Sequence, residues 1–163
     1  AGSEPLNFQE VNVKDLFNLL SSDLEALAQE KGVAFNLGPM DNLSVRADRL
    51  RLRQLFLNIL DNAIRYTPSG GTVSSSLVRK NGRAFVSISD TGIGIPSEDL
   101  PFIFDRFYRV DKARSRADGG MGLGLAIASS IAKLHGGEIE VESQVGKGTT
   151  FYITLPLLES SLG

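Results

Sequence analysis

The sequence predicts a two-layer α/β sandwich, in which a mixed, mostly antiparallel sheet packs on three helices. Three segments repeat apolar residues at three- and four-residue spacing, the pattern of helices with one buried face. Two pairs of β-rich segments are each joined by a glycine-containing turn, which is typical of hairpins. Helices and strands alternate only in part, and this favours the sandwich over a regularly alternating fold.

Start and stop signals define the elements. Asn12 and Asp48 can cap helices with their side chains, and Gly32 can end the first helix. Asn81-Gly82 is a strong signal for a two-residue hairpin turn. The expected elements are a strand over 9–13, a helix to 31, strands near 33–37 and 43–46 separated by a Gly38-Pro39 turn, a helix from 49 to about 66, strands over 72–80 and 83–90, a helix over 123–134, and strands over 138–143 and 149–155.

Bulk composition excludes several classes of protein. The 163 residues carry 17 basic and 19 acidic side chains, without the basic excess of a nucleic-acid surface. There is no cysteine, so disulfides and thiolate metal sites are excluded, and no apolar run reaches the roughly 20 residues of a membrane helix. We expect a cloning remnant and linker over 1–7, one domain over 8–158 and a tail over 159–163.

A polar stripe runs along the second helix. Gln54, Asn58, Asn62 and Tyr66 follow one another at four-residue spacing and therefore share one side. Asparagine is a poor helix former, so two in register require a reason. The stripe is either a solvated face or a set of carboxamide oxygens for a hard cation such as Mg²⁺, which prefers oxygen ligands and accompanies phosphates.

Two glycine-rich turns follow. Asp90-Thr91-Gly92-Ile93-Gly94-Ile95 comes directly after a strand, where an ionised Asp90 can accept from an exocyclic amine. Taken alone, this hexapeptide is better explained as a plain turn. The second turn, 119–125, opens the third helix and offers free N–H groups to a phosphate. It lacks the preceding strand of a dinucleotide fingerprint and the Lys-Ser or Lys-Thr of a P-loop.

Basic residues cluster between the two turns. Five lie within the eleven residues of 106–116, either as a solvated loop or as partners for a polyphosphate. His135, the only histidine, ends the third helix. A helix C-terminus favours a partly positive imidazole, so we expect a structural role for His135 rather than a catalytic or phosphoacceptor one.

The order of these motifs resembles the catalytic domain of sensor histidine kinases, within the GHKL ATPase superfamily. Asn58–Thr67 (NILDNAIRYT) resembles the N box, Asp90–Ile95 (DTGIGI) the G1 box and Phe104–Arg109 (FDRFYR) the F box. Gly120–Leu125 (GMGLGL) is similar to the G2 box, and Gly146–Phe151 (GKGTTF) to the final glycine turn. The resemblance extends from about residue 11 to 155.

The resemblance implies a site for Mg²⁺ and ATP. Asn62 would hold the metal with support from Asn58, and Asp90 would accept from the adenine amine. Arg109 would stabilise the transferring γ-phosphoryl group, flanked by Tyr108, and residues 112–119 would form a mobile lid. The remaining nucleotide-binding positions that it implies are Arg65, Tyr66, Gly92, Gly94, Ile95, Phe107, Lys112, Gly120, Gly122, Leu123, Gly124, Leu125, Thr149 and Thr150.

The resemblance also implies what this chain does not carry. The phosphoacceptor histidine and its neighbouring acidic base belong to a separate helical hairpin that also dimerises the kinase, and no such motif occurs here. We therefore expect a monomeric, cytoplasmic fragment that binds ATP with little turnover. Its partners would be that hairpin and, indirectly, a response regulator, with no nucleic-acid or direct membrane contact; the parent could be anchored in the inner membrane.

Three other functions share parts of this pattern. A GHKL serine kinase is disfavoured because FDRFYR resembles the histidine kinases more closely. An ATP-gated clamp usually carries a glutamate in the N-box helix, and none lies between Arg46 and Pro96. A scaffold that has lost ATP binding is disfavoured because no motif position is visibly broken.

Overall fold

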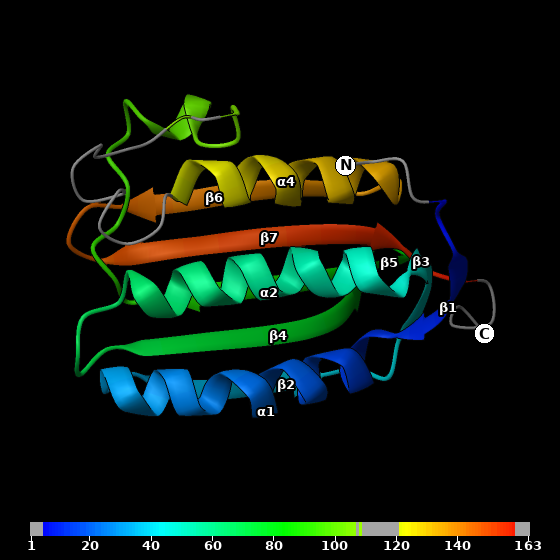
Figure 1. Ribbon diagram of the computed structural model, residues 1–163, viewed down its shortest axis with the longest axis horizontal. Coiled ribbons are helices and arrows are strands. Elements are labelled where there is room, and N and C mark those ends of the chain that lie inside the picture. The colour runs from blue at the N-terminus through cyan, green and yellow to red at the C-terminus, as the bar shows by residue number, and fades with distance from the viewer. Residues whose placement is uncertain (1–4, 107, 109–120, 159–163) are drawn as a thin grey trace.

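A computed structural model describes residues 5–106, 108 and 121–158 as a sheet with three helices on one of its faces (Figure 1). Residues 107 and 109–120, among them the expected lid, lie outside the described part, as do both ends of the chain. The helices are α1 (Val13–Lys31), α2 (Arg49–Arg65) and α4 (Met121–Leu134), with a short 3₁₀ helix, η1 (Leu100–Phe102). The strands are β1 (Phe8–Asn12), β2 (Ala34–Met40), β3 (Ser44–Asp48), β4 (Thr72–Lys80), β5 (Arg83–Asp90), β6 (Glu138–Gln144) and β7 (Gly148–Pro156).

The five-stranded sheet has the order β2-β4-β5-β7-β6. The β2–β4 pair is parallel and the other three pairs are antiparallel, so the predicted mixed, mostly antiparallel sheet is confirmed. The hairpin β4–β5 turns at Asn81-Gly82 as expected, and both residues have positive φ, as a tight two-residue turn of this kind requires. The predicted turn at Gly38-Pro39 is wrong: both residues lie within β2, where the register shifts between Leu37 and Met40. An edge strand tolerates proline and a bulge there, because one of its sides makes no ladder.

The helix caps form as the sequence predicts. The Asn12 side chain accepts from the Asp15 N–H at 2.9 Å, and Gly32 ends α1 in the left-handed conformation with φ 77°. Asp48 caps α2 by accepting from the Arg51 N–H at 3.1 Å. These local hydrogen bonds define where the helices begin and end.

Helix α2 lies between α1 and α4 in the helical layer, as Figure 1 shows. Its inner face contains Leu52, Phe56 and Ile59, all fully buried. The Phe56 ring packs against Phe17 of α1 with centroids 4.7 Å apart, and this pair joins two helices over the sheet. No described helix combines the length and apolar character needed to cross a membrane.

A second, two-stranded sheet, β1–β3, lies at one end of the helices (Figure 1). His135, directly after α4, connects α4 to this small sheet through Asp48 of β3. Its Nε2 accepts from the Asp48 backbone N–H at 3.1 Å, and its Nδ1 lies 2.8 Å from the Ile131 carbonyl oxygen. Because a carbonyl oxygen only accepts, Nδ1 carries the proton and the imidazole is neutral. The structural role is confirmed, but the expected partly positive imidazole is corrected, since a second proton would face the Asp48 N–H.

We predict that His135→Phe lowers the free energy of unfolding by about 1–3 kcal/mol, because the Asp48 N–H loses its acceptor and the Ile131 carbonyl oxygen loses its side-chain donor, keeping the backbone N–H of residue 135 at 3.2 Å. The variant keeps an aromatic ring against Phe8, whose centroid lies 5.4 Å from that of His135. Urea denaturation of variant and parent measures the difference. Equal stability would mean that the two hydrogen bonds contribute nothing net.

Candidate nucleotide-binding site

Three chain segments distant in sequence meet at one end of the sheet. The end of α2 reaches the turn after β5 through the Tyr66 carbonyl, which accepts from the Ile93 N–H at 3.2 Å. The turn between β6 and β7 reaches the same loop, because the Gly146 N–H donates to the Ile93 carbonyl at 2.9 Å. A pocket lies where they meet, lined by Asn62, Ala63, Tyr66, Asp90, Ile93, Gly94, Ile95, Thr149 and Phe151.

Asp90 has the only carboxylate among the described residues that line this pocket. One carboxylate oxygen, Oδ1, accepts from the Gly92 N–H at 2.8 Å and the Thr149 N–H at 3.2 Å. Burial raises the pKa of Asp90 to about 6, against the opposing effect of those two hydrogen bonds. At neutral pH the carboxylate is therefore ionised, with Oδ2 left to accept a hydrogen bond from a ligand.

The glycines of the turn after β5 allow backbone segments to pack closely. A side chain at Gly92 would collide with the Tyr66 carbonyl, and one at Gly94 with the backbone of Gln144. Gly94 also has φ 76°, a conformation that other residues rarely adopt. Glycine is thus required at these two positions because other backbone segments pack directly against them, and this packing holds the Asp90 turn against α2 and β6. Gly94 lines the pocket as well.

The threonine pair divides between the two faces of the sheet. Thr149 is buried and lines the pocket, whereas the Thr150 hydroxyl lies 2.7 Å from the Ser89 hydroxyl on the side away from the helices. The inclusion of Thr150 among the pocket residues is therefore corrected to Thr149 alone. The period of two along β7 explains this, because Phe151 is buried on the same side as Thr149.

The four residues of the polar stripe on α2 do not all face the pocket. Asn62 and Tyr66 line the pocket, and Asn58, which is half-buried, lies one turn before Asn62. Gln54 instead lines a groove on the outside of the helical layer. Arg65 is exposed and pairs with Asp61, with Nε and Oδ2 2.8 Å apart, so its side chain is engaged beside the pocket rather than in it.

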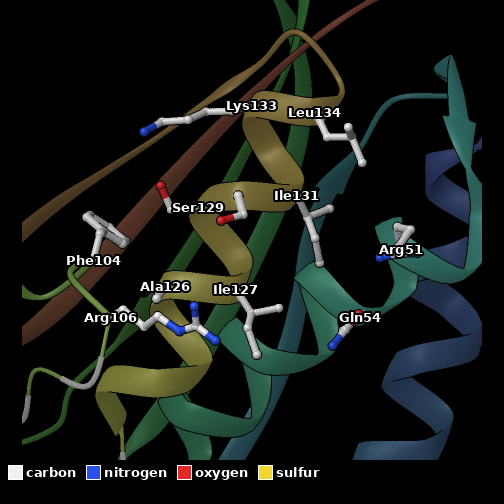
Figure 2. A pocket seen from close by; sticks show the side chains of 11 residues that line it. Arg51, Gln54, Phe104, Arg106, Ala126, Ile127, Ser129, Ile131, Lys133 and Leu134 are labelled. Atoms are coloured by element: carbon white, nitrogen blue, oxygen red, sulfur yellow. The ribbon is translucent and has the colours of Figure 1, made fainter. Parts of the chain in front are cut away.

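The groove that contains Gln54 is much larger, about 720 Å³, and is open to solvent. Figure 2 shows Ile127, Ile131 and Leu134 of α4 along it, with Phe104 and Arg106 at one side. Apart from Gln54, no residue predicted to bind the nucleotide or metal lies among these described lining residues. Size alone would favour the groove, but the smaller pocket has the convergent polar groups that define a ligand site.

The other predicted positions have different surroundings. The Tyr108 hydroxyl donates to the Asp99 carboxylate, and this hydrogen bond is the main cause that raises the pKa of Tyr108. The backbone of Gly122, Leu123 and Gly124 lies in the first turn of α4, and Leu125 is fully buried. Phe107, Arg109, Lys112 and Gly120 lie outside the described residues. Among the described residues, no three His, Cys, Asp or Glu side chains gather into a metal site.

Sequence reasoning missed Ser143 of β6. Its Oγ accepts from the Ile95 N–H at 2.7 Å and lies 2.8 Å from the Thr149 hydroxyl. A signal was present: Ser143 continues the inward-facing alternation of Ile139 and Val141, and a polar residue at such a position requires a partner.

Comparisons with known proteins show the family to which this chain belongs. Residues 47–159 match the family described as histidine kinase-, DNA gyrase B- and HSP90-like ATPase. The signal transduction histidine-protein kinase ArlS of Staphylococcus aureus is 50% identical over 112 residues, which cover 69% of this chain and 25% of ArlS. The chain thus spans about a quarter of the length of the curated relatives it matches.

Solved structures of two histidine kinases have the same fold. Full-length ShkA in complex with AMPPNP superposes with a TM-score of 0.81 at 30% identity, covering 96% of this chain and 32% of ShkA. The nucleotide-free catalytic domain of ThkA gives 0.78 at 27% identity, covering 93% of this chain and 96% of that domain. ThkA in complex with the response regulator TrrA gives 0.75 at 28% identity, with 93% of this chain and 42% of the ThkA chain covered.

We predict that Asp90→Asn stabilises the protein at pH 8 and not at pH 4. The carboxyl pKa is 3.8 in the unfolded chain and about 6 in the folded protein, so folding becomes less favourable as pH rises between these values. The shift, reduced for the solvent that still reaches the group, corresponds to about 1–2 kcal/mol above pH 6. Asparagine keeps an oxygen for the Gly92 and Thr149 N–H groups and removes the charge.

Urea unfolding of variant and parent, compared across this pH range, measures the effect. The difference between the two proteins isolates Asp90 from the other titrating groups. A stability difference that does not change between pH 4 and pH 8 would contradict the assignment.

Proposed function

This chain belongs to the family of histidine kinase-, DNA gyrase B- and HSP90-like ATPases, as the ATP-binding catalytic domain of a sensor histidine kinase, and we propose that its pocket around Asp90 binds the adenine of Mg-ATP. We also propose that the parent kinase transfers the γ-phosphoryl group to a histidine of a separate dimerisation domain. The observation that carries the proposal is the ionised Asp90 carboxylate among apolar neighbours: Oδ1 accepts from two backbone N–H groups, and Oδ2 is left to accept from a ligand.

The chemistry of the pocket suits adenine. Ile93, Ile95 and Phe151 offer apolar surface to a flat base, and Asp90 offers an acceptor to an amino group. The first turn of α4, at 121–124, supplies N–H groups and the positive end of the helix dipole for phosphates. The family resemblance adds Phe107, Lys112 and Gly120, which lie outside the described residues, as nucleotide contacts. It also implies that Arg109 would stabilise the γ-phosphoryl group and that Tyr108 would flank it.

The donor set fits a magnesium ion that arrives with phosphates. Asn62 in the pocket and Asn58 one turn before it present carboxamide oxygens, which are hard ligands. A protein site for Mg²⁺ usually provides few ligands and leaves the rest to substrate phosphates and water. Bound there, the ion would neutralise charge on the phosphate oxygens. The part of Asn62 is to hold and orient it.

The proposed division of labour follows from the chemistry of phosphoryl transfer. The protein contributes positioning and charge stabilisation rather than covalent chemistry. A domain that holds ATP without its acceptor therefore binds the donor and turns over little. The ThkA–TrrA complex supports the further proposal that a response regulator receives the phosphoryl group from the parent of this chain.

Calorimetric titration of the chain with ATP, ADP and GTP, each with and without Mg²⁺, tests the proposal. We predict saturable binding of ATP and ADP that Mg²⁺ alters, weak or no binding of GTP, and no appreciable hydrolysis. The physical reason is that Asp90 accepts from an amino group and opposes the carbonyl oxygen of guanine. Absence of adenine-nucleotide binding, or equal binding of GTP, would refute the proposed site.

We also predict that Asn62→Ala removes most of the effect of Mg²⁺ on ATP affinity, with roughly a tenfold loss of affinity in its presence, corresponding to about 1.4 kcal/mol. Affinity without Mg²⁺ should change little, because the variant removes a metal ligand and not a base contact. Asn18→Ala, at an exposed position on α1, is the matched control. An unchanged response to Mg²⁺ in Asn62→Ala would exclude this residue as a ligand.

A further inference from the structure

Ser143 forms a buried hydroxyl junction beside the pocket. It lies on β6 opposite Thr149 of β7, and its Oγ contacts three groups. The Ile95 N–H donates to it at 2.7 Å, it donates to the Gly148 carbonyl at 3.0 Å, and the Thr149 hydroxyl lies 2.8 Å away. These contacts join the turn after β5 to the turn before β7.

The proton count at this junction fixes the direction of each hydrogen bond. A serine hydroxyl has one proton and two acceptor lone pairs. The Gly148 carbonyl can only accept, so it takes the proton of Ser143. The Ile95 N–H fills one lone pair, and the Thr149 hydroxyl therefore donates its own proton into the other. With its proton used in this way, Thr149 Oγ1 can only accept from anything else.

Asp90, like the Thr149 hydroxyl, can only accept a hydrogen bond from a ligand. Its Oδ1 accepts from the Gly92 and Thr149 N–H groups, and Oδ2 also can only accept while the group is ionised. The Thr149 N–H contacts this carboxylate through Oδ1, and both residues line the pocket, so each brings an acceptor to the same site. An amino group at position 6 of a purine has two protons, one for each acceptor, whereas a 6-oxo group has none.

We infer that Ser143 is a positioning residue for base recognition: by holding the proton of the Thr149 hydroxyl, it keeps that hydroxyl an acceptor and so makes the pocket select 6-amino over 6-oxo purines together with Asp90. The inference rests on the proposed adenine site and adds a determinant of its specificity. Ser143 itself does not line the pocket and acts through Thr149.

Removal of the Ser143 hydroxyl frees the Thr149 proton. In Ser143→Ala the Thr149 hydroxyl can rotate, either toward the Gly148 carbonyl or toward the ligand, and can then donate to a 6-oxo group. The Ile95 N–H also loses its acceptor. Affinity for an adenine nucleotide should fall, while affinity for a hypoxanthine nucleotide should fall less or rise. The ratio of the two affinities distinguishes this effect from general loosening of the pocket, which would weaken both equally.

The test is titration of the whole chain with ATP and ITP, whose bases differ in the group at position 6 and in the proton that N1 carries beside the 6-oxo group. We expect the parent to bind ATP more tightly than ITP, and we expect Ser143→Ala to lower the ratio of the two affinities about tenfold. Ser143→Thr should restore it, because the hydroxyl is kept. Ser75→Ala is the matched control: Ser75 is buried on β4, and its hydroxyl contacts no partner among the described residues.

A second variant separates positioning from structure. Thr149→Val keeps the shape of the side chain and removes the hydroxyl through which Ser143 is inferred to act. It should contract the preference by itself, and adding Ser143→Ala to it should contract the preference no further, because the two residues form one unit. Thr149→Val also serves as the test if Ser143→Ala fails to fold.

Three results would overturn the inference: an unchanged ATP-to-ITP ratio in Ser143→Ala, an equal loss for both nucleotides, or a further contraction on adding Ser143→Ala to Thr149→Val. Each leaves the proposed function standing as long as the parent binds ATP. Failure of the parent to bind either nucleotide would instead refute the proposed function, so the two failures are distinguishable.

Discussion

The site depends on keeping one carboxylate ionised in a largely apolar pocket. Burial of Asp90 raises its pKa to about 6, which opposes folding at neutral pH, and two backbone N–H groups offset part of that cost. One of these donors comes from the turn after β5 and the other from the start of β7. The carboxylate therefore links two turns that the chain brings together only when the sheet is complete. Without these two donors the ionised form would be less favourable, and the pKa of Asp90 would rise further.

The remaining contacts keep the Asp90 turn in place. The Tyr66 carbonyl at the end of α2 and the Gly146 N–H between β6 and β7 bond the two sides of Ile93. Gly92 and Gly94 are small enough to let those backbones approach. At the opposite end of the helices, the His135 contact to Asp48 joins α4 to the start of α2. Helix α2 is thus fixed at both ends, and this sets the position of Asn62 relative to Asp90.

Local signals predicted the fold well, and long-range contacts explain what they missed. Asn12, Gly32 and Asp48 act within a few residues of themselves, so their caps could be predicted from sequence. The Gly38-Pro39 turn was wrong because its meaning depends on β2 lying at a sheet edge, which local sequence does not specify. The neutral state of His135 depends on an N–H 87 positions away in the sequence, and no local pattern encodes that.

The candidate site divides in the same way. The motifs singled out Asp90, Asn62 and Thr149, and the structure places all three in the lining of one pocket, while their parts in binding stay predictions. The buried Phe151 next to Thr150 could have excluded Thr150 by strand alternation alone. Ser143 needed more, because its significance lies in which groups its single proton and two lone pairs engage. Residue types therefore predict which atoms can recognise a base, whereas hydrogen-bond directions, available only from the folded structure, determine which of those atoms donate and which accept. A hydroxyl can either donate or accept until its neighbours fix the position of its proton. For this reason a residue outside the pocket can influence which base the pocket accepts.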